Sequence, residues 1–177
     1  LGIGNVISFE DGAEGKNSLG KVVPTIKFVI SCKDAPNIII DEENKSINST
    51  FALEKHLEEF IVDNWNNISL GKNYYRCEKE VEGKRKKFRT DTGEIDIFAK
   101  SKDEKEFLII ELKKGRASDK VIGQIQNYMG FVKEELANNG EIVKGIIIAL
   151  EDDQRIRRAL RVTNNIEFYR YKINFNL

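Results

Sequence analysis

Gly93-Glu-Ile-Asp96-Ile-Phe-Ala99 and Phe107-Leu-Ile-Ile-Glu111-Leu-Lys113 predict two neighbouring β-strands. Both runs are rich in β-branched and aromatic residues, which favour strands. The residues between them are all polar or charged, as expected of a hairpin tip. Glu111 and Lys113, two residues apart, point to the same face of their strand. If the strands pair, Asp96 therefore meets Glu111 and Lys113 at one edge of a sheet.

This predicted arrangement has two interpretations. A carboxylate such as Asp96 inside an apolar run needs a partner for its charge. Two converging carboxylates suit Mg²⁺, a hard cation that keeps several waters and often works with substrate phosphates. The alternative is a salt bridge between neighbouring strands at the surface. The spacing alone leaves both interpretations open.

Five blocks of the sequence resemble the PD-(D/E)XK nuclease superfamily, and within it the NucS-like endonuclease domains. The blocks are Leu53-Glu-Lys-His-Leu-Glu-Glu-Phe-Ile-Val-Asp-Asn-Trp65, Thr90-Asp-Thr-Gly-Glu-Ile-Asp-Ile97, Glu111-Leu-Lys-Lys-Gly-Arg-Ala-Ser-Asp119, Gly123-Gln-Ile-Gln-Asn-Tyr-Met-Gly130 and Val143-Lys-Gly-Ile-Ile-Ile-Ala149. Asp96 matches the first acid and Glu111-Leu112-Lys113 the (D/E)-x-K element. The resemblance runs from about Phe51 to the C-terminus. It implies an α/β fold with a restriction-endonuclease-like mixed β-sheet flanked by helices.

The resemblance also implies a role for each matching residue. Asp96, Glu111 and the backbone carbonyl of Leu112 are expected to hold Mg²⁺ or Mn²⁺. Lys113 is expected to position or deprotonate the attacking water. Gln124 is expected to orient the cluster and Arg116 to contact a phosphate.

Two of the implied positions keep structural alternatives. An acid on the first helix is expected to point at the metal site; Glu58 fits by motif position and Glu54 is the second choice, and either could be a plain surface glutamate. Tyr128, one turn after Gln124, is expected to support that glutamine and to contact nucleic acid. A core-edge glutamine and a packing tyrosine are the alternative for that pair.

Basic residues are clustered, although the 29 basic and 29 acidic side chains cancel. A zero net charge weakens a purely electrostatic case for nucleic-acid binding. One cluster immediately precedes the Asp96 strand and is expected to bind nucleic acid through Lys84, Arg85, Lys86, Lys87 and Arg89. A second cluster, Arg155 to Arg161, follows acids that predict a helix start. Either cluster could instead be a solvated surface.

The remaining patterns predict the order of elements. Apolar residues at helical spacing predict a helix from Ser49/Thr50 to about Trp65 and a long helix to about Ala137. Further strands are predicted over 73–80, 145–150 and 166–175. Residues 1–46 are expected to form a β-rich N-terminal appendage with strands at 22–31 and 37–41. The nuclease domain is then expected over 47–177, in a longer protein because the chain begins with Leu rather than Met.

Apolar runs are too short for a membrane span, and Cys32 and Cys77 predict reduced thiols of a cytoplasmic protein. We therefore expect a Mg²⁺-dependent DNA endonuclease of restriction, repair or defence type, with DNA as partner and a homodimer as an open alternative. A catalytically silent nuclease-like module that binds nucleic acid for a larger protein is the second hypothesis. An interaction domain with an incidental charge cluster is the third.

Overall fold

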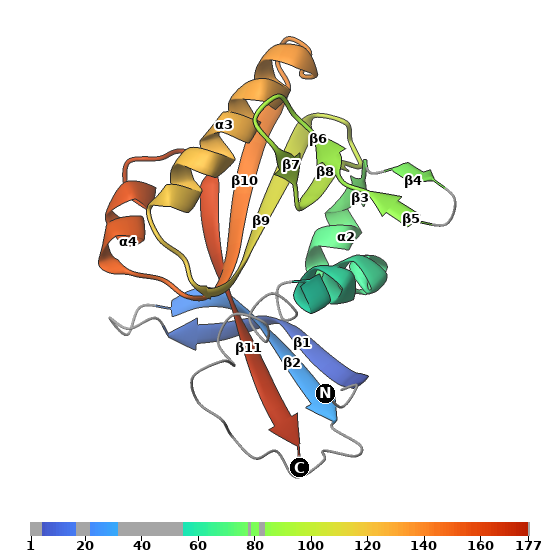
Figure 1. The fold of residues 1–177 in the computed structure, drawn as a ribbon, viewed down its shortest axis with the longest axis vertical. Coiled ribbons are helices and arrows are strands. Elements are labelled where there is room, and N and C mark those ends of the chain that lie inside the picture. The colour runs from blue at the N-terminus through green and yellow to red at the C-terminus, as the bar shows by residue number, and fades with distance from the viewer. Residues whose placement is uncertain (1–4, 17–21, 32–54, 78, 82–83, 177) are drawn as a thin grey trace.

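A mixed β-sheet forms the centre of the fold. The computed structural model describes residues 5–16, 22–31, 55–77, 79–81 and 84–176 (Figure 1). Within these residues, seven strands pair in the order β1-β2-β11-β10-β9-β8-β3. Their bounds are β1 Asn5–Lys16, β2 Val22–Ser31, β3 Tyr74–Arg76, β8 Ile97–Ser101, β9 Glu106–Arg116, β10 Ile142–Glu151 and β11 Ile166–Asn176. Two short ribbons lie apart from it: β4 (Lys79–Val81) with β5 (Lys84–Lys86), and β6 (Phe88–Arg89) with β7 (Glu94–Ile95).

Helices lie on both faces of the central strands. Residues 55–63 are helical and are followed by the 3₁₀ turn η1 (Trp65–Asn67) and the short α2 (Ser69–Asn73). The predicted start of the first helix at Ser49/Thr50 lies outside the described residues. The long helix α3 (Lys120–Glu135) ends two residues before its predicted end, and α4 (Gln154–Leu160) carries the second basic cluster. Asp153 caps α4 by accepting a hydrogen bond from the Ile156 amide at 2.8 Å.

Strand directions confirm the predicted mixed sheet. β8 and β9 form the expected antiparallel hairpin, in which Ile97 pairs with Ile110. β9 continues through α3 into β10, which lies parallel to β9 and to β11. Such a crossover requires a connection long enough to hold a helix, and α3 supplies it. The fold is therefore the α/β sheet flanked by helices that the sequence predicts.

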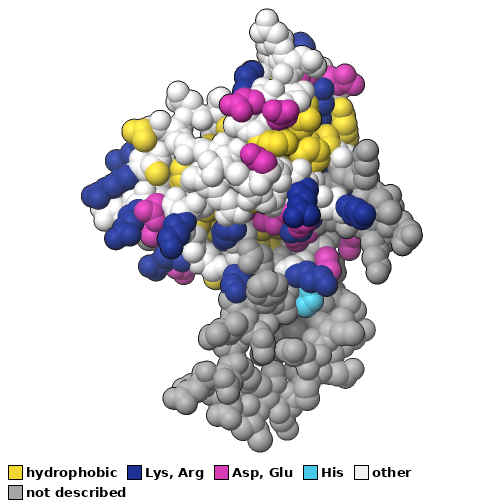
Figure 2. Space-filling model, turned by 45° about the horizontal axis from the view of Figure 1, so that its top comes forward, with side chains coloured by type: hydrophobic (Ala, Val, Ile, Leu, Met, Phe, Trp, Pro, Cys, Tyr) yellow, Lys and Arg dark blue, Asp and Glu magenta, His cyan; other side chains and the backbone are white. Residues whose placement is uncertain are grey.

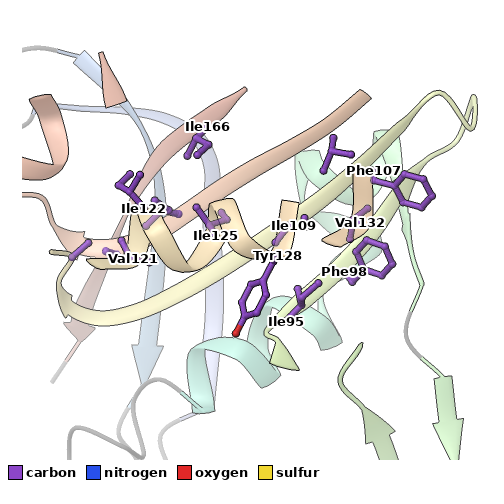
Figure 3. Packing of buried hydrophobic residues seen from close by; sticks show 14 of the residues in the cluster. Ile95, Phe98, Phe107, Ile109, Val121, Ile122, Ile125, Tyr128, Val132 and Ile166 are labelled. Carbon is purple, nitrogen blue, oxygen red and sulfur yellow. The ribbon is translucent and has the colours of Figure 1, made fainter. Parts of the chain in front are cut away.

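Alternate residues of the central strands enter two separate cores. On β9, Leu108, Ile110 and Leu112 pack in the layer formed by the first helix and η1. Phe107 and Ile109 face the opposite way and pack under α3, as Figure 3 shows for Ile109 between Ile125 and Val132. Complete burial of each aliphatic side chain stabilises the fold by roughly 1.5–3 kcal/mol. The same alternation places Glu111 and Lys113 on the α3 face.

The N-terminal strands extend the sheet through β11. β11 pairs with β10 along residues 166–170 and with β2 along residues 170–176. Figure 1 shows β1, β2 and the end of β11 together below the helices. The predicted strand at 22–31 coincides with β2. The predicted strand at 37–41 and the expected boundary near residue 46 lie outside the described residues. No described helix has the length and apolar character needed to cross a membrane.

Candidate active site

Asp96 lies between β7 and β8, where the chain enters the central sheet. Its Oδ2 accepts a hydrogen bond from the backbone amide of Leu112 at 2.9 Å. A carboxylate that accepts from a backbone N–H makes a charge-assisted bond, which is stronger than a neutral one. Asp96 is thereby fixed beside the middle residue of the Glu111-Leu112-Lys113 element.

Glu111 and Lys113 form an ion pair along one strand. The Lys113 Nζ donates to Glu111 Oε2 at 3.0 Å. The Glu111 side chain is 1% exposed, and its Oε1 has no hydrogen-bond partner among the described residues. Burial, together with the nearby charge of Asp96, raises the pKa of Glu111 to about 7, although the Lys113 charge opposes this rise. The pair therefore leaves one buried carboxylate oxygen available for a cation.

Lys87 connects two carboxylates that come from different segments. Its Nζ lies 2.6 Å from Glu58 Oε2 and 2.7 Å from Asp96 Oδ1. All three side chains are mostly buried, since Lys87 is 29%, Glu58 12% and Asp96 17% exposed. The Lys87 ammonium thus joins Glu58 to Asp96, and the expected metal role of Glu58 stays a prediction. Glu54, the second choice, lies outside the described residues.

Gln124 and Tyr128 occupy successive turns of α3. The Gln124 Nε2 donates to the Tyr128 hydroxyl at 3.3 Å. Tyr128 is buried in the core beside Ile95 (Figure 3), whereas the sequence places it among the nucleic-acid contacts. Its hydroxyl lies against Gly93, where φ is +154° and an added Cβ would come within 2.6 Å of that oxygen. Only glycine fits this close approach, so the packing of Tyr128 requires glycine in the turn that leads into Asp96.

The expected phosphate-binding residues differ in their surroundings. Lys86 and Arg89 are exposed, while the side chains of Lys84 and Arg85 lie outside the described part of the chain. Arg116 is 65% exposed and lies 3.4 Å from Glu151. Such an exposed pair contributes little to stability and leaves the guanidinium accessible.

The second basic cluster splits between two environments. Arg157 pairs with Asp152 at 3.5 Å, whereas Arg155, Arg158 and Arg161 are exposed or partly exposed. Figure 2 shows Lys and Arg side chains gathered on the left, the side on which α4 lies. Three of the four arginines therefore remain accessible on one side of the molecule.

The donor atoms fit a hard divalent cation. Asp96 and Glu111 supply carboxylate oxygens, and Glu111 Oε1 is buried without a hydrogen-bond partner in the described structure. Oxygen ligands of this kind are typical of Mg²⁺ and Mn²⁺ sites, whereas structural zinc sites favour cysteine and histidine. Across the described ranges, however, no three His, Cys, Asp or Glu side chains are grouped as a metal site.

Lys87 is the site residue whose position the sequence does not predict. The sequence groups it with its neighbours as a phosphate-binding residue, yet its ammonium lies between Glu58 and Asp96. Nothing in the run Lys84-Arg-Lys-Lys-Phe-Arg89 distinguishes Lys87 from the lysine before it. Only the fold of the flanking ribbons separates the two lysines.

The mixed sheet, with an acid fixed against a Glu-x-Lys strand, defines a nuclease of the PD-(D/E)XK-like class. A family model, the endonuclease NucS C-terminal domain, matches residues 53–174, and the chain belongs to this family. None of the curated protein sequences compared with the chain matches it.

Solved structures have a similar fold. A structure titled as an EndoMS–dsDNA2 complex is 19% identical, with a TM-score of 0.52 over 76% of this chain and 48% of its own. A repair endonuclease from Pyrococcus abyssi is 18% identical, with a TM-score of 0.49 over 68% of this chain and 46% of its own. The chain thus spans about half the length of these proteins.

Proposed function

We propose that this chain is the catalytic domain of a divalent-metal-dependent DNA endonuclease that acts in repair, restriction or defence. The hydrogen bond from the Leu112 amide to Asp96 Oδ2 carries the proposal. Through this bond Asp96 lies beside the strand that carries a buried carboxylate, Glu111, and an ammonium, Lys113, which supports its assignment as the first acid. An ordinary surface salt bridge between strands would leave these groups solvated, and Glu111 is almost completely buried.

The family and a fold neighbour support nucleic acid as the substrate. The family model is that of an endonuclease domain, and the EndoMS structure was solved with double-stranded DNA. The accessible basic side chains of Lys86, Arg89 and Arg116 would contact phosphates beside the acidic site. Phosphate contacts position a duplex and give affinity without sequence information. DNA is therefore the proposed partner.

The proposed reaction assigns separate tasks to the carboxylates and the lysine. Asp96, Glu111 and the Leu112 carbonyl would hold Mg²⁺ or Mn²⁺. Such an ion, when bound, polarises the phosphate and lowers the pKa of a water molecule. Lys113 would orient the attacking water and balance the negative charge that develops on the phosphate. Gln124, hydrogen-bonded to buried Tyr128, would hold its amide oxygen toward the cluster.

A cleavage assay with defined substrates tests this proposal. Perfect duplex, mismatched duplex, branched DNA and single-stranded DNA are incubated with the protein and Mg²⁺, Mn²⁺ or EDTA. We expect cleavage of at least one substrate with a divalent ion and none with EDTA or with Asp96→Asn. Cleavage that persists in Asp96→Asn would point to a contaminating nuclease. The assay and sedimentation of the protein with and without duplex also test whether a homodimer acts on two strands.

Lys87 gives the second hypothesis, a catalytically silent module, a specific observation in its favour. Its ammonium already pairs with both Glu58 and Asp96 and balances part of the charge that a metal ion would balance. A silent module would bind DNA equally well with and without divalent ions and would cleave none of the four substrates. The same experiment therefore separates the two functions.

A further inference from the structure

We infer that Lys87 is an internal counter-ion of the candidate metal site, which a divalent cation must displace from Asp96 before the site can fill. The inference rests on the proposed function in one respect, the use of Asp96 as a metal ligand. Lys87 is then a positioning residue, because it acts on the carboxylates and not on the substrate.

The hydrogen bonds of Asp96 restrict where a cation can enter. Its Oδ2 is directed at the Leu112 amide at 2.9 Å, and its Oδ1 is directed at Lys87 Nζ at 2.7 Å. A cation that binds Oδ1 therefore competes with the Lys87 ammonium for the same oxygen.

Lys87 also stands between two of the acids that a bound cation would draw together. The ammonium lies within 2.7 Å of both Glu58 and Asp96 and holds them at its own contact distance. It supplies one positive charge where a divalent cation would supply two. Removing this charge leaves two carboxylates close together, which raises the attraction for a divalent cation.

Lys87 differs in this respect from the other lysine of the site. Lys113 pairs with Glu111 Oε2, but Glu111 Oε1 is left without a hydrogen-bond partner in the described structure. Glu111 can thus accept a cation while it keeps Lys113. A cation on Asp96 Oδ1 would instead lie against the like charge of the Lys87 ammonium, so Lys87 is the group that has to move.

Calorimetric titration of Mn²⁺ into the DNA-free protein tests the competition. The variants are Lys87→Met, which removes the charge, Lys87→Gln, which keeps a neutral donor for the carboxylates, and Lys87→Arg, which keeps the charge. We expect Mn²⁺ to bind roughly tenfold more tightly to the Met and Gln variants, because charge-assisted hydrogen bonds no longer have to be broken. The Arg variant is expected to bind no more tightly than the parent. Lys86→Met is the matched control, since Lys86 is the exposed neighbour in the same run.

Thermal unfolding gives an independent reading of the same competition. Without metal, Lys87→Met is expected to melt at a lower temperature than the parent because Glu58 and Asp96 lose their partner. Saturating Mn²⁺ should raise its melting temperature more than that of the parent, as tighter binding to the folded state requires. If Lys87 were purely structural, its replacement would lower the melting temperature without raising the affinity for Mn²⁺.

The outcomes distinguish this inference from the proposed function. Unchanged or weaker Mn²⁺ binding in both Lys87→Met and Lys87→Gln overturns the inference. If Asp96→Asn loses Mn²⁺ binding in the same experiment, the assignment of Asp96 as a metal ligand still stands. Binding by Lys87→Met but not by the parent is the strongest support. If no variant binds Mn²⁺, the inference falls together with the metal site. If the Lys87 variants bind Mn²⁺ tightly but the protein cleaves no DNA, the proposed activity is wrong and the counter-ion role of Lys87 is supported.

Discussion

The two lysines of the candidate site hold their carboxylates in different ways. Lys113 and Glu111 are two residues apart on β9, so strand geometry alone puts them on one face. Lys87 joins Glu58 on the first helix to Asp96 before β8, and only the completed fold brings these segments together. The β9 pair is thus a local feature, whereas the Lys87 bridge depends on tertiary structure. The difference predicts that the cleavage rate depends most on the β9 pair and that metal entry depends most on the Lys87 bridge.

Removing the ammonium of the β9 pair should have the largest effect. Lys113→Ala is expected to reduce cleavage by about 100-fold or more, the range for loss of one positioned group that stabilises charge in the transition state. DNA affinity should stay within a few-fold, because one ammonium is a small part of a contact with many phosphates. Single-turnover cleavage and fluorescence anisotropy measure the two quantities. Lys102→Ala, at the exposed tip of the same hairpin, is the control.

Equal cleavage by Lys113→Ala and the parent would contradict the role that the comparison gives to the β9 pair. The β9 pair would then be structural, and the mechanism assigned to Lys113 would be wrong.

Glu111 gives the next largest effect, on stability. Its pKa is about 7 in the folded protein against an ordinary value of 4.5, so the folded protein keeps a proton that the unfolded chain releases. The free energy of unfolding should therefore fall as pH rises from about 4.5 to about 7, by on the order of 2–3 kcal/mol. Below that window the contribution is fully present. Urea unfolding in EDTA at pH 5 and pH 8 measures the loss.

Glu111→Gln supplies the control for this pH dependence. A neutral amide of the same shape does not titrate, so this component should disappear and the variant should gain on the parent at pH 8. Parallel pH profiles of the two proteins would show that the local pair does not carry the buried charge. Residual dependence shared by both proteins belongs to other groups.

The same contrast explains how much the sequence predicts. Alternation along 107–113 predicts the hairpin, the buried faces of β9 and the Glu111–Lys113 face, because these follow from a two-residue repeat. The position of Lys87 does not follow, because a basic run has no periodicity that selects one of its members. The family resemblance implies a DNA contact for Tyr128, with a packing tyrosine as the alternative. Its burial depends on how closely α3 packs against the Gly93 turn. Local repeats are therefore readable in the sequence, whereas the choice of Lys87 as the residue that joins two distant acids is not.

The basic run should divide into one inner and several outer residues. Replacing Lys84, Arg85 and Lys86 together with Gln is expected to weaken DNA binding. It should also reduce the slope of log affinity against log salt by about one unit for each phosphate that the variant no longer neutralises. Mn²⁺ affinity should not change, in contrast to the Lys87 variants. Anisotropy titrations at several salt concentrations measure the slope.

A matched replacement in the second basic cluster locates the DNA path. Arg155, Arg158 and Arg161 lie on α4 or at its end and carry the same total charge. If their replacement with Gln changes the salt slope and the first triple variant does not, the backbone of the DNA follows α4. A triple variant of the basic run that loses Mn²⁺ affinity would mean that its outer members also shape the metal site.

Tyr128→Phe should have the smallest effect, and it tests the hydrogen bond between Tyr128 and Gln124. The change removes only the hydroxyl, whose hydrogen bond from Gln124 is long at 3.3 Å, and leaves the buried ring in place. We expect a loss of about 0.5–1.5 kcal/mol in unfolding free energy, the usual net value of one hydrogen bond. DNA affinity should be unchanged because Tyr128 is 4% exposed. A several-fold loss of DNA affinity in a fully folded Tyr128→Phe would mean that Tyr128 becomes exposed when DNA binds, and the site would then depend on rearrangement of α3 against the Gly93 turn.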